Sequence, residues 1–148
     1  MDHLYFLKSL HWTAVGTYHD GDGNTYPLRG RVRIIRNAEQ WTLDGYLEVL
    51  SNPPARFTND YHIRATDRAE TLAWESYNPA LGILRGTFEF IDDAILSFYH
   101  SEDGSYSGTE TLLLNANHSY FNVGVSFHNG RKMSSWTAKL TIAPEQDA

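Results

Sequence analysis

The chain has 148 residues, a formal net charge of −6 at pH 7 and no cysteine. The missing cysteines exclude disulfides and thiolate metal sites and favour a cytoplasmic location, and the negative charge argues against nucleic acid as a partner. Aromatic residues make up 14% of the chain, which is typical of half-buried β-sheet surfaces.

The opening segment, residues 1–11, differs from the rest of the chain. Leu4, Leu7 and Leu10 recur at helical spacing behind Asp2, a favourable N-cap residue, so a short helix is expected here. The segment lacks the basic flank and long apolar core of a signal peptide. No stretch reaches the roughly 20 apolar residues of a membrane span, so none is expected.

Residues 12–143 alternate between apolar and polar, and turn-forming residues interrupt the alternation at short intervals. These interruptions lie at 20–24, 37–40, 51–56, 67–70, 78–82, 91–93, 102–104, 115–118 and 129–130. About ten strands result, and their loops are too short for parallel crossovers, so neighbouring strands should be antiparallel. With residues 144–148 as a tail, the chain is expected to form one domain, 1–148.

Loop lengths and side-chain alternation together predict which residues lie side by side. A two-residue type I′ turn at 129–130 gives the pairs Phe127–Lys132, Val125–Ser134 and Val123–Trp136. A three-residue loop at 102–104 gives His100–Tyr106, Phe98–Gly108 and Leu96–Glu110. The other hairpins give Ile34–Leu43, Ala65–Leu72, Trp74–Gly86, Phe88–Leu96 and Leu112–Phe121.

One apolar face shared by about ten sequential strands can be buried by closing the sheet on itself. The fold class is therefore expected to be all-β, an up-and-down antiparallel β-barrel with the N-terminal helix closing one end. Near the helix end the predicted inward residues are apolar, from Trp12 to Leu140, and at the far end they are mostly polar. The barrel should have an apolar floor and a polar mouth. Gly86, Gly108 and Gly124 inside strands should mark bends of the closing wall.

The stretch LHWTAVGTY, residues 10–18, resembles the start of the calycins, the lipocalin and fatty-acid-binding group. In that group a short helix closes one end of the barrel and a tryptophan at the start of the first strand, here Trp12, seals the floor. Leu10 stands where lipocalins usually carry glycine, and only DGDGN stands where fatty-acid-binding proteins insert a helical lid. The resemblance implies a small-molecule binding barrel.

Glu110 is the most informative candidate residue, because it alternates with Leu112 and Leu114 and should point into the barrel at mid-height. A lone carboxylate there needs a partner, a raised pKa or water in a cavity. The predicted ligand-binding residues are Tyr18, Tyr26, Asn59, Tyr61, Trp74, Ser76, His100, Tyr106, Glu110 and Trp136. The tryptophans would stack on a ligand and the polar residues would orient it.

Three functions are compatible with these residues. The first is binding of a small hydrophobic or aromatic molecule, partly apolar and ring-containing, inside the barrel. The second is an isomerase- or cyclase-type enzyme that uses the same pocket with Glu110 or His100 as base. The third is a filled barrel that acts as an interaction module, and a homodimer is also compatible with the sequence. No cofactor can be named.

Other motifs favour plain structural roles. Asp20, Asp22 and Asn24 are spaced as in a calcium loop, but Thr25 and Arg31 stand where that loop needs glycine and glutamate. The seven histidines show no ligand spacing, so no metal site is expected. The basic stretch RGRVRIIR should pair across strands, Arg33 with Asp44 and Arg29 with Glu48, with Asp44 continuing to His62.

Overall fold

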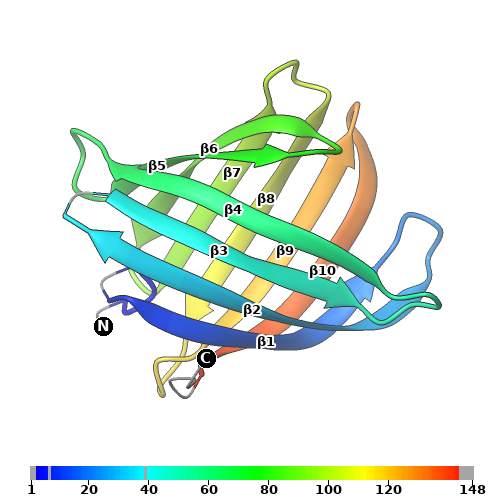
Figure 1. The fold of residues 1–148 in the computed structure, drawn as a ribbon, viewed down its shortest axis with the longest axis horizontal. Helices are drawn as coiled ribbons and strands as arrows, with labels where there is room; N and C mark the ends of the chain where they lie inside the picture. Colours follow the sequence, from blue (N-terminus) through cyan, green and yellow to red (C-terminus); the bar gives the residue numbers. More distant parts are fainter. Residues whose placement is uncertain (1–2, 7, 39, 144–148) are drawn as a thin grey trace.

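A closed antiparallel barrel of ten strands forms the molecule (Figure 1). The computed structural model describes residues 3–6, 8–38 and 40–143. The strands are β1 (Leu10–His19), β2 (Thr25–Asn37), β3 (Gln40–Val49), β4 (Ala55–Ala65), β5 (Thr71–Asn78), β6 (Gly82–Ile91), β7 (Ala94–Ser101), β8 (Tyr106–Leu114), β9 (Tyr120–His128) and β10 (Arg131–Ile142). Each strand pairs with the next, and β1 pairs with β10, which confirms the predicted up-and-down barrel.

The N-terminal segment packs into one end of the barrel without forming a helix among its described residues. Tyr5 and Phe6 lie in a turn, and a single helix-like hydrogen bond joins the Lys8 N–H to the Leu4 carbonyl at 3.4 Å. Both rings are buried, and successive residues of a helix would point about 100° apart. Residues 1–2, 7 and the tail 144–148 lie outside the described residues. No helical segment of the described chain has the length and hydrophobicity that a transmembrane span needs.

The floor predicted at this end is a cluster of aromatic rings. Trp12 and Tyr120 have no exposed surface, and Tyr5 lies between them at centroid distances of 5.2 and 5.5 Å. The Trp41 indole N–H donates to the Phe6 carbonyl oxygen at 2.6 Å, which ties the segment to β3. Burial of such rings stabilises this end by several kcal/mol in total, at roughly 2–3 kcal/mol for each large apolar side chain.

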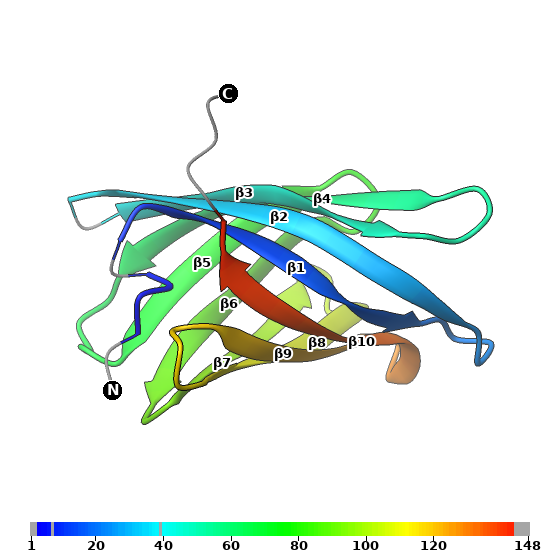
Figure 2. The ribbon, with the colours of Figure 1, turned by 90° about the horizontal axis from the view of Figure 1, so that it is seen from below.

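Several hairpins have the predicted register. Ile34 pairs with Leu43, Ala65 with Leu72 and Trp74 with Gly86. Asn129 and Gly130 both have positive φ, as a type I′ turn requires, and Phe127 lies opposite Lys132. Figure 2 shows that β2, β3 and β4 form a wall, which faces β7, β8 and β9 across the barrel.

The predicted register of β7 is wrong by one residue. The loop that follows β7 holds four residues, 102–105, because the Asp103 carboxylate accepts hydrogen bonds from the Ser105 N–H and from the Ser101 and Ser105 hydroxyls. Ser97 therefore lies opposite Glu110 and Phe88, in the place predicted for Leu96. The whole strand is turned over by this shift, so Leu96, Phe98 and His100 face outward.

The predicted register of β9 is wrong for the same kind of reason. Five residues, 115–119, separate β8 from β9, so Leu112 lies opposite Asn122 instead of Phe121. A β-bulge between Lys132 and Ser134 then returns β10 to its expected face, which places Trp136 opposite Gly124 and Val125 opposite Ser135. The inward residues of β9 are consequently Tyr120, Asn122, Gly124 and Ser126.

Candidate functional site

The inward side chains are buried at the floor of the barrel and become partly exposed toward the opposite end, called here the open end. Among the inward side chains at the open end, Tyr18, Tyr26 and Tyr61 keep part of their surface exposed. Phe57 on β4 also faces inward, where it stacks on Tyr18 at 6.3 Å between centroids, yet 46% of its surface is accessible. An inward phenylalanine with that exposure indicates that the open end is not filled by protein.

Glycines on the inner wall determine where the interior aromatic rings lie. A Cβ atom on Gly86 would come within 2.9 Å of the Trp74 ring, and one on Gly124 would overlap the Trp136 ring. Each ring therefore lies directly against the glycine of the neighbouring strand. Besides the bends of the wall predicted for Gly86 and Gly124, these glycines thus provide space for the neighbouring rings.

A third ring and its glycine repeat this arrangement on the next pair of strands, where a Cβ on Gly108 would overlap the Tyr99 side chain. Tyr61 stacks on Trp74 with centroids 4.3 Å apart and planes 2° apart. The Trp74 indole N–H donates to Ser97 Oγ at 3.1 Å. The Trp74 and Tyr61 rings are thereby fixed in position.

Glu110 lies at mid-height of the interior, as predicted from its alternation. It stands in one row with Ser97 and Gly124. Beside it, Trp136 Nε1 donates to Asn122 Oδ1 at 3.0 Å, and Asn122 Nδ2 donates to the Thr111 carbonyl oxygen at 3.2 Å. Burial raises the pKa of Glu110, and the polar groups of Asn122 and Trp136 oppose the rise only in part.

The tyrosines around Glu110 respond to its charge. Burial, followed by the charge of Glu110, raises the pKa of Tyr99 to about 12 and raises that of Tyr61 well above its ordinary value. Among the described residues Glu110 forms no ion pair with lysine, arginine or histidine. The interior thus combines aromatic faces with one carboxylate whose charge no protein cation neutralises.

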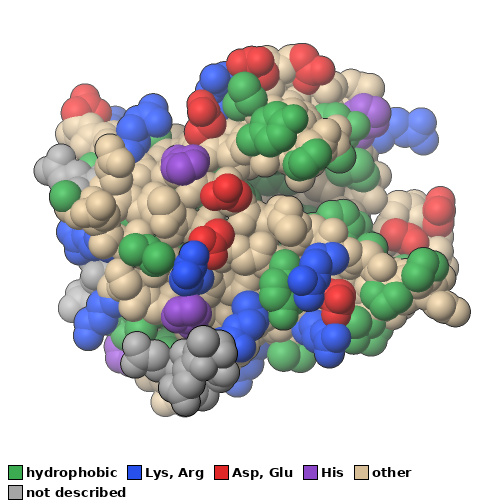
Figure 3. Space-filling model, viewed as in Figure 1, with side chains coloured by type: hydrophobic (Ala, Val, Ile, Leu, Met, Phe, Trp, Pro, Cys, Tyr) green, Lys and Arg blue, Asp and Glu red, His purple; other side chains and the backbone are tan. Residues whose placement is uncertain are grey.

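The barrel wall is incomplete beside the open end. β4 pairs with β3 along its length but pairs with β5 only over residues 61–65, so residues 55–60 have no partner on that side. Figure 1 shows β4 and β5 diverging from this point. In the space-filling view the surface is hollowed between the two strands (Figure 3). Phe57 and Asn59 face inward from the unpaired part of β4 and would line a route into the barrel.

The structure places nine of the ten predicted ligand-binding residues on the inner wall. Tyr18, Tyr26, Asn59, Tyr61, Trp74, Ser76, Tyr106, Glu110 and Trp136 all lie on inward positions. His100 does not, because the longer loop after β7 turns it to the exposed outer surface beside Arg85. Sequence reasoning missed Ser97, Tyr99 and Asn122, the inward residues of the two strands whose register was wrong. Phe57 could have been found, because it alternates with Asn59 and Tyr61.

The described residues contain no group of three or more His, Cys, Asp or Glu side chains that could hold a metal ion. His3 is buried at the floor, where it bonds the Tyr120 hydroxyl at 2.9 Å and the Asp92 carbonyl oxygen at 2.7 Å. In the loop 20–24, Asp20 accepts hydrogen bonds from the backbone N–H groups of Asp22 and Asn24, both at 2.9 Å. This loop is thus closed by its own side chains.

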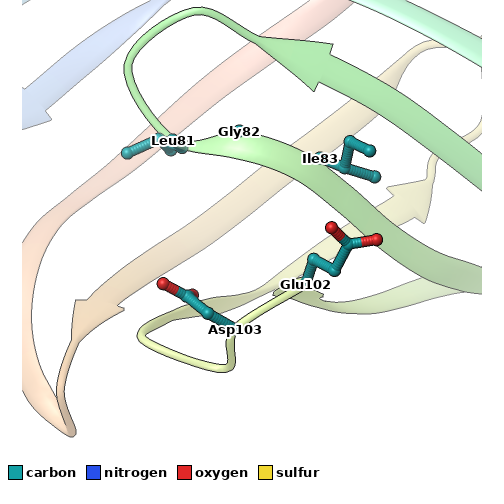
Figure 4. A pocket seen from close by; sticks show the side chains of 5 residues that line it. All are labelled: Leu81, Gly82, Ile83, Glu102 and Asp103. Atoms are coloured by element: carbon teal, nitrogen blue, oxygen red, sulfur yellow. The ribbon is translucent and has the colours of Figure 1, made fainter.

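Two shallow cavities lie outside the interior. One, of about 280 Å³, lies between the turn before β6 and the loop after β7 (Figure 4). Its carboxylates are already engaged, Glu102 with Arg85 at 3.2 Å and Asp103 within its own loop. The other, of about 210 Å³, is an apolar groove on the outer wall of β6, β7 and β8. The first cavity carries no free functional group, and the second belongs to the outer surface.

Comparison with solved structures finds a similar barrel. The S-type phycobiliprotein lyase CPES from Guillardia theta superimposes with a TM-score of 0.65 over 94% of this chain and 90% of that chain, at 6% sequence identity. At this identity the likeness concerns the fold. No protein family model matches the sequence, and no curated protein matches it. The comparison therefore supports the predicted barrel architecture.

Proposed function

We propose that the protein binds a small, partly apolar, ring-containing molecule inside the barrel. The observation that carries this proposal is the seating of Trp74, Tyr99 and Trp136 against glycines, beside an open end where Phe57 stays accessible. A protein that needed only a filled core would gain by pointing these rings into the centre. The likeness to a phycobiliprotein lyase supports the proposal, because it shows that a similar barrel occurs in a protein named as an enzyme.

Ligand orientation would come from Glu110 and the polar residues near it. A carboxylate with no cation beside it favours a ligand group that donates hydrogen bonds, such as a ring N–H or a protonated nitrogen. Trp136 and Tyr99 flank this position and would contact the faces of a ring, which adds cation–π attraction if the ring nitrogen is charged. A ligand of this kind could enter at the open end or between β4 and β5.

A second candidate function is an isomerase- or cyclase-type reaction with Glu110 as general base. The raised pKa of Glu110 favours this role, because general bases work best with a pKa near the operating pH. His100, the other base considered from the sequence, faces outward and is excluded. The protein would then act on the same ring-containing molecule in the same place.

Binding in the interior is tested with Nile red, an uncharged ring-containing fluorophore, and with a matched pair of variants. Asn59→Trp fills the open end from an inward position, and Thr58→Trp adds the same side chain one residue away on the outer wall. We expect the first variant to weaken Nile red binding at least about tenfold, a loss of about 1.4 kcal/mol, and the second to change it less than about twofold. Equal effects of the two variants would contradict interior binding.

Native mass spectrometry of the freshly purified protein identifies the natural ligand if one is retained. With that molecule in hand, Glu110→Gln separates the two candidate functions. In an enzyme with Glu110 as base, turnover should fall by about 10²–10⁴-fold while the bound molecule is retained. In a binding protein, affinity alone should fall. A barrel that retains no molecule and binds no Nile red would contradict both functions.

A further inference from the structure

Polar side chains from four separate parts of the chain gather around one point of the barrel interior. They are the carboxylate of Glu110 on β8 and the hydroxyls of Tyr5, Tyr61 and Tyr99, and they are called here the interior polar cluster. Burial, and after it the charge of Glu110, raises the pKa of each of the three tyrosines. The hydroxyls from the N-terminal segment, β4 and β7 are thus all within electrostatic reach of one carboxylate.

The three hydroxyls of this cluster have no partner in the protein. Within the part of the chain that the structure describes, none of them forms a hydrogen bond, although Tyr5 is only 5% exposed. In the same residues the indole N–H of Trp12 is the one side-chain polar atom that is both unpaired and closed off. The hydroxyls are therefore unpaired but accessible, so they border open space inside the barrel. Unpaired polar groups in such a place suit a ligand that supplies their partners.

Aromatic faces border the same space. The Tyr61 ring stacks on Trp74 at 4.3 Å between centroids, and the Tyr99 ring is tilted by 53° against Trp74 at 5.8 Å. Gly108, against which Tyr99 lies, is the inward position next to Glu110 on β8. The faces of such rings are electron-rich and attract a positive charge within about 6 Å. The carboxylate and the ring faces thus favour the same kind of ligand.

No cation of the protein competes for this space. Among the described inward positions, lysine and arginine occur only at the two ends of the barrel. Arg36 is exposed at the floor end, where it lies over the Trp41 ring, and Arg131 lies at the rim opposite His128. This rim is about 13 Å along the strands from the row of Glu110. The net charge of −6 also attracts cations from solution.

We propose that the ligand of the interior site is an organic cation whose positively charged nitrogen lies beside Glu110 and against the faces of Trp74 and Tyr99. This inference rests on the proposed function and deepens it, because it assigns a charge to the ring-containing molecule. A positive charge favours the ionised form of the carboxylate and offsets the cost of burying it. The tyrosine oxygens add hydrogen-bond acceptors, and the ring faces add cation–π attraction. A neutral ligand leaves the carboxylate without a counter-charge, and an anion is repelled by it.

Two dyes with the same fused ring system test the charge of the ligand. Nile blue is a cation, whereas Nile red is uncharged. In fluorescence titrations of the wild-type chain at about pH 7.5 and low salt, we expect Nile blue to bind at least about tenfold more tightly than Nile red. Equal affinities, or tighter binding of Nile red, would overturn the inference. They would leave the proposed function intact, because Nile red binding alone supports a ligand site in the interior.

A matched pair of variants locates the charge effect. Glu110→Gln and Glu102→Gln each remove one negative charge, the first inside the barrel and the second on an exposed loop at the open end. We expect Glu110→Gln to weaken Nile blue binding at least about tenfold and Nile red binding less than about threefold. Glu102→Gln should change both affinities less than about twofold. Equal effects of the two variants on Nile blue would assign the preference to the net charge of the molecule and overturn the inference.

The contribution of the ring faces is tested at Tyr99. Tyr99→Phe keeps the ring and removes the hydroxyl, whereas Tyr99→Leu removes both. We expect the ratio of Nile blue to Nile red affinity to fall about fivefold in Tyr99→Leu and less than about twofold in Tyr99→Phe. Circular dichroism verifies that the variants fold. An unchanged ratio in Tyr99→Leu would overturn the position assigned to the nitrogen, and a wild-type chain that binds neither dye would overturn the proposed function together with this inference.

Discussion

The wall of β2, β3 and β4 and the wall of β7, β8 and β9 have opposite designs. On the first wall, large apolar residues such as Ile34 and Leu43 point inward and charged residues point outward. On the second, the inward positions hold small residues such as Ser97 and Gly124, and the outward positions hold larger apolar ones such as Phe98. The comparison teaches that the larger apolar face of a strand is not always the core face.

The inward and the outward residues of β7, β8 and β9 each have a physical explanation. Small inward residues on β7, β8 and β9 make room for the Tyr99 and Trp136 rings and for the carboxylate of Glu110. Large outward residues forgo the stabilisation of burial, which is worth about 25 cal/mol for every Å² of apolar surface removed from water. The inverted pattern on these adjacent strands thus agrees with the proposed ligand site inside the barrel.

The largest expected effect comes from truncating a phenylalanine to alanine, once on the inward face and once on the outward face of the barrel wall. Phe88 on β6 is 3% exposed and faces the floor cluster, whereas Phe98 on β7 is 58% exposed. Phe88→Ala should lower the free energy of unfolding by about 3–5 kcal/mol because it leaves a cavity, and Phe98→Ala by less than about 1 kcal/mol. Urea denaturation measures both. Equal losses would mean that β7 has the register predicted from the sequence.

A second effect tests the seating of the rings. Gly124→Ala adds a methyl group where the Trp136 ring lies, so the ring must move and its hydrogen bond to Asn122 is strained. We expect a loss of about 2–3 kcal/mol in the free energy of unfolding and a change in tryptophan fluorescence. Val123→Ala, the adjacent outward position, is the control and should cost less than about 1 kcal/mol. A neutral Gly124→Ala would show that the interior is looser than the structure has it.

Sequence reasoning succeeded where one face of a strand is clearly polar. The pairs Ile34–Leu43 and Trp74–Gly86, the closed barrel and the position of Glu110 followed from alternation and loop length. It failed where both faces carry apolar residues, because the register then depends on loop geometry alone. One extra residue in the loop after β7, added by the hydrogen bonds to Asp103, moved His100 from the proposed site to the outer surface. An aspartate two residues before a serine is a local signal of such a turn.

The third effect concerns pH and Glu110. Burial raises the pKa of Glu110 in the folded chain above its unfolded value, so the folded chain holds the proton more tightly. Its contribution to stability is therefore complete at pH values below the unfolded pKa and is lost as the pH rises through the folded pKa. Glu110→Gln should remove this loss, which raises the free energy of unfolding at pH 8 by about 1–2 kcal/mol relative to wild type.

Thermal denaturation between pH 4 and pH 9 measures the effect, with Glu102→Gln as an exposed control. Asp103 titrates in a different window, since the Ser105 N–H and the two serine hydroxyls lower its pKa to about 2. Its stabilising contribution is lost only as the pH falls through that value, so it does not overlap with the change assigned to Glu110. If wild type and Glu110→Gln lost stability equally toward pH 9, the carboxylate would have to be solvated instead of buried.

The smallest effect belongs to the charged wall. The Arg33 guanidinium bonds both oxygens of Asp44, at 3.2 and 2.8 Å, but both side chains are about half exposed, so a double-mutant cycle should give a coupling of about 0.3–1 kcal/mol.

Asp44 lies opposite Asp60, whereas the sequence suggested His62, and like charges opposed across strands repel. Asp60→Asn should therefore stabilise the chain by a few tenths of a kcal/mol at low salt. The gain should vanish near 1 M salt, where screening reaches about 3 Å, and a gain that persisted there would assign it to side-chain packing instead of charge.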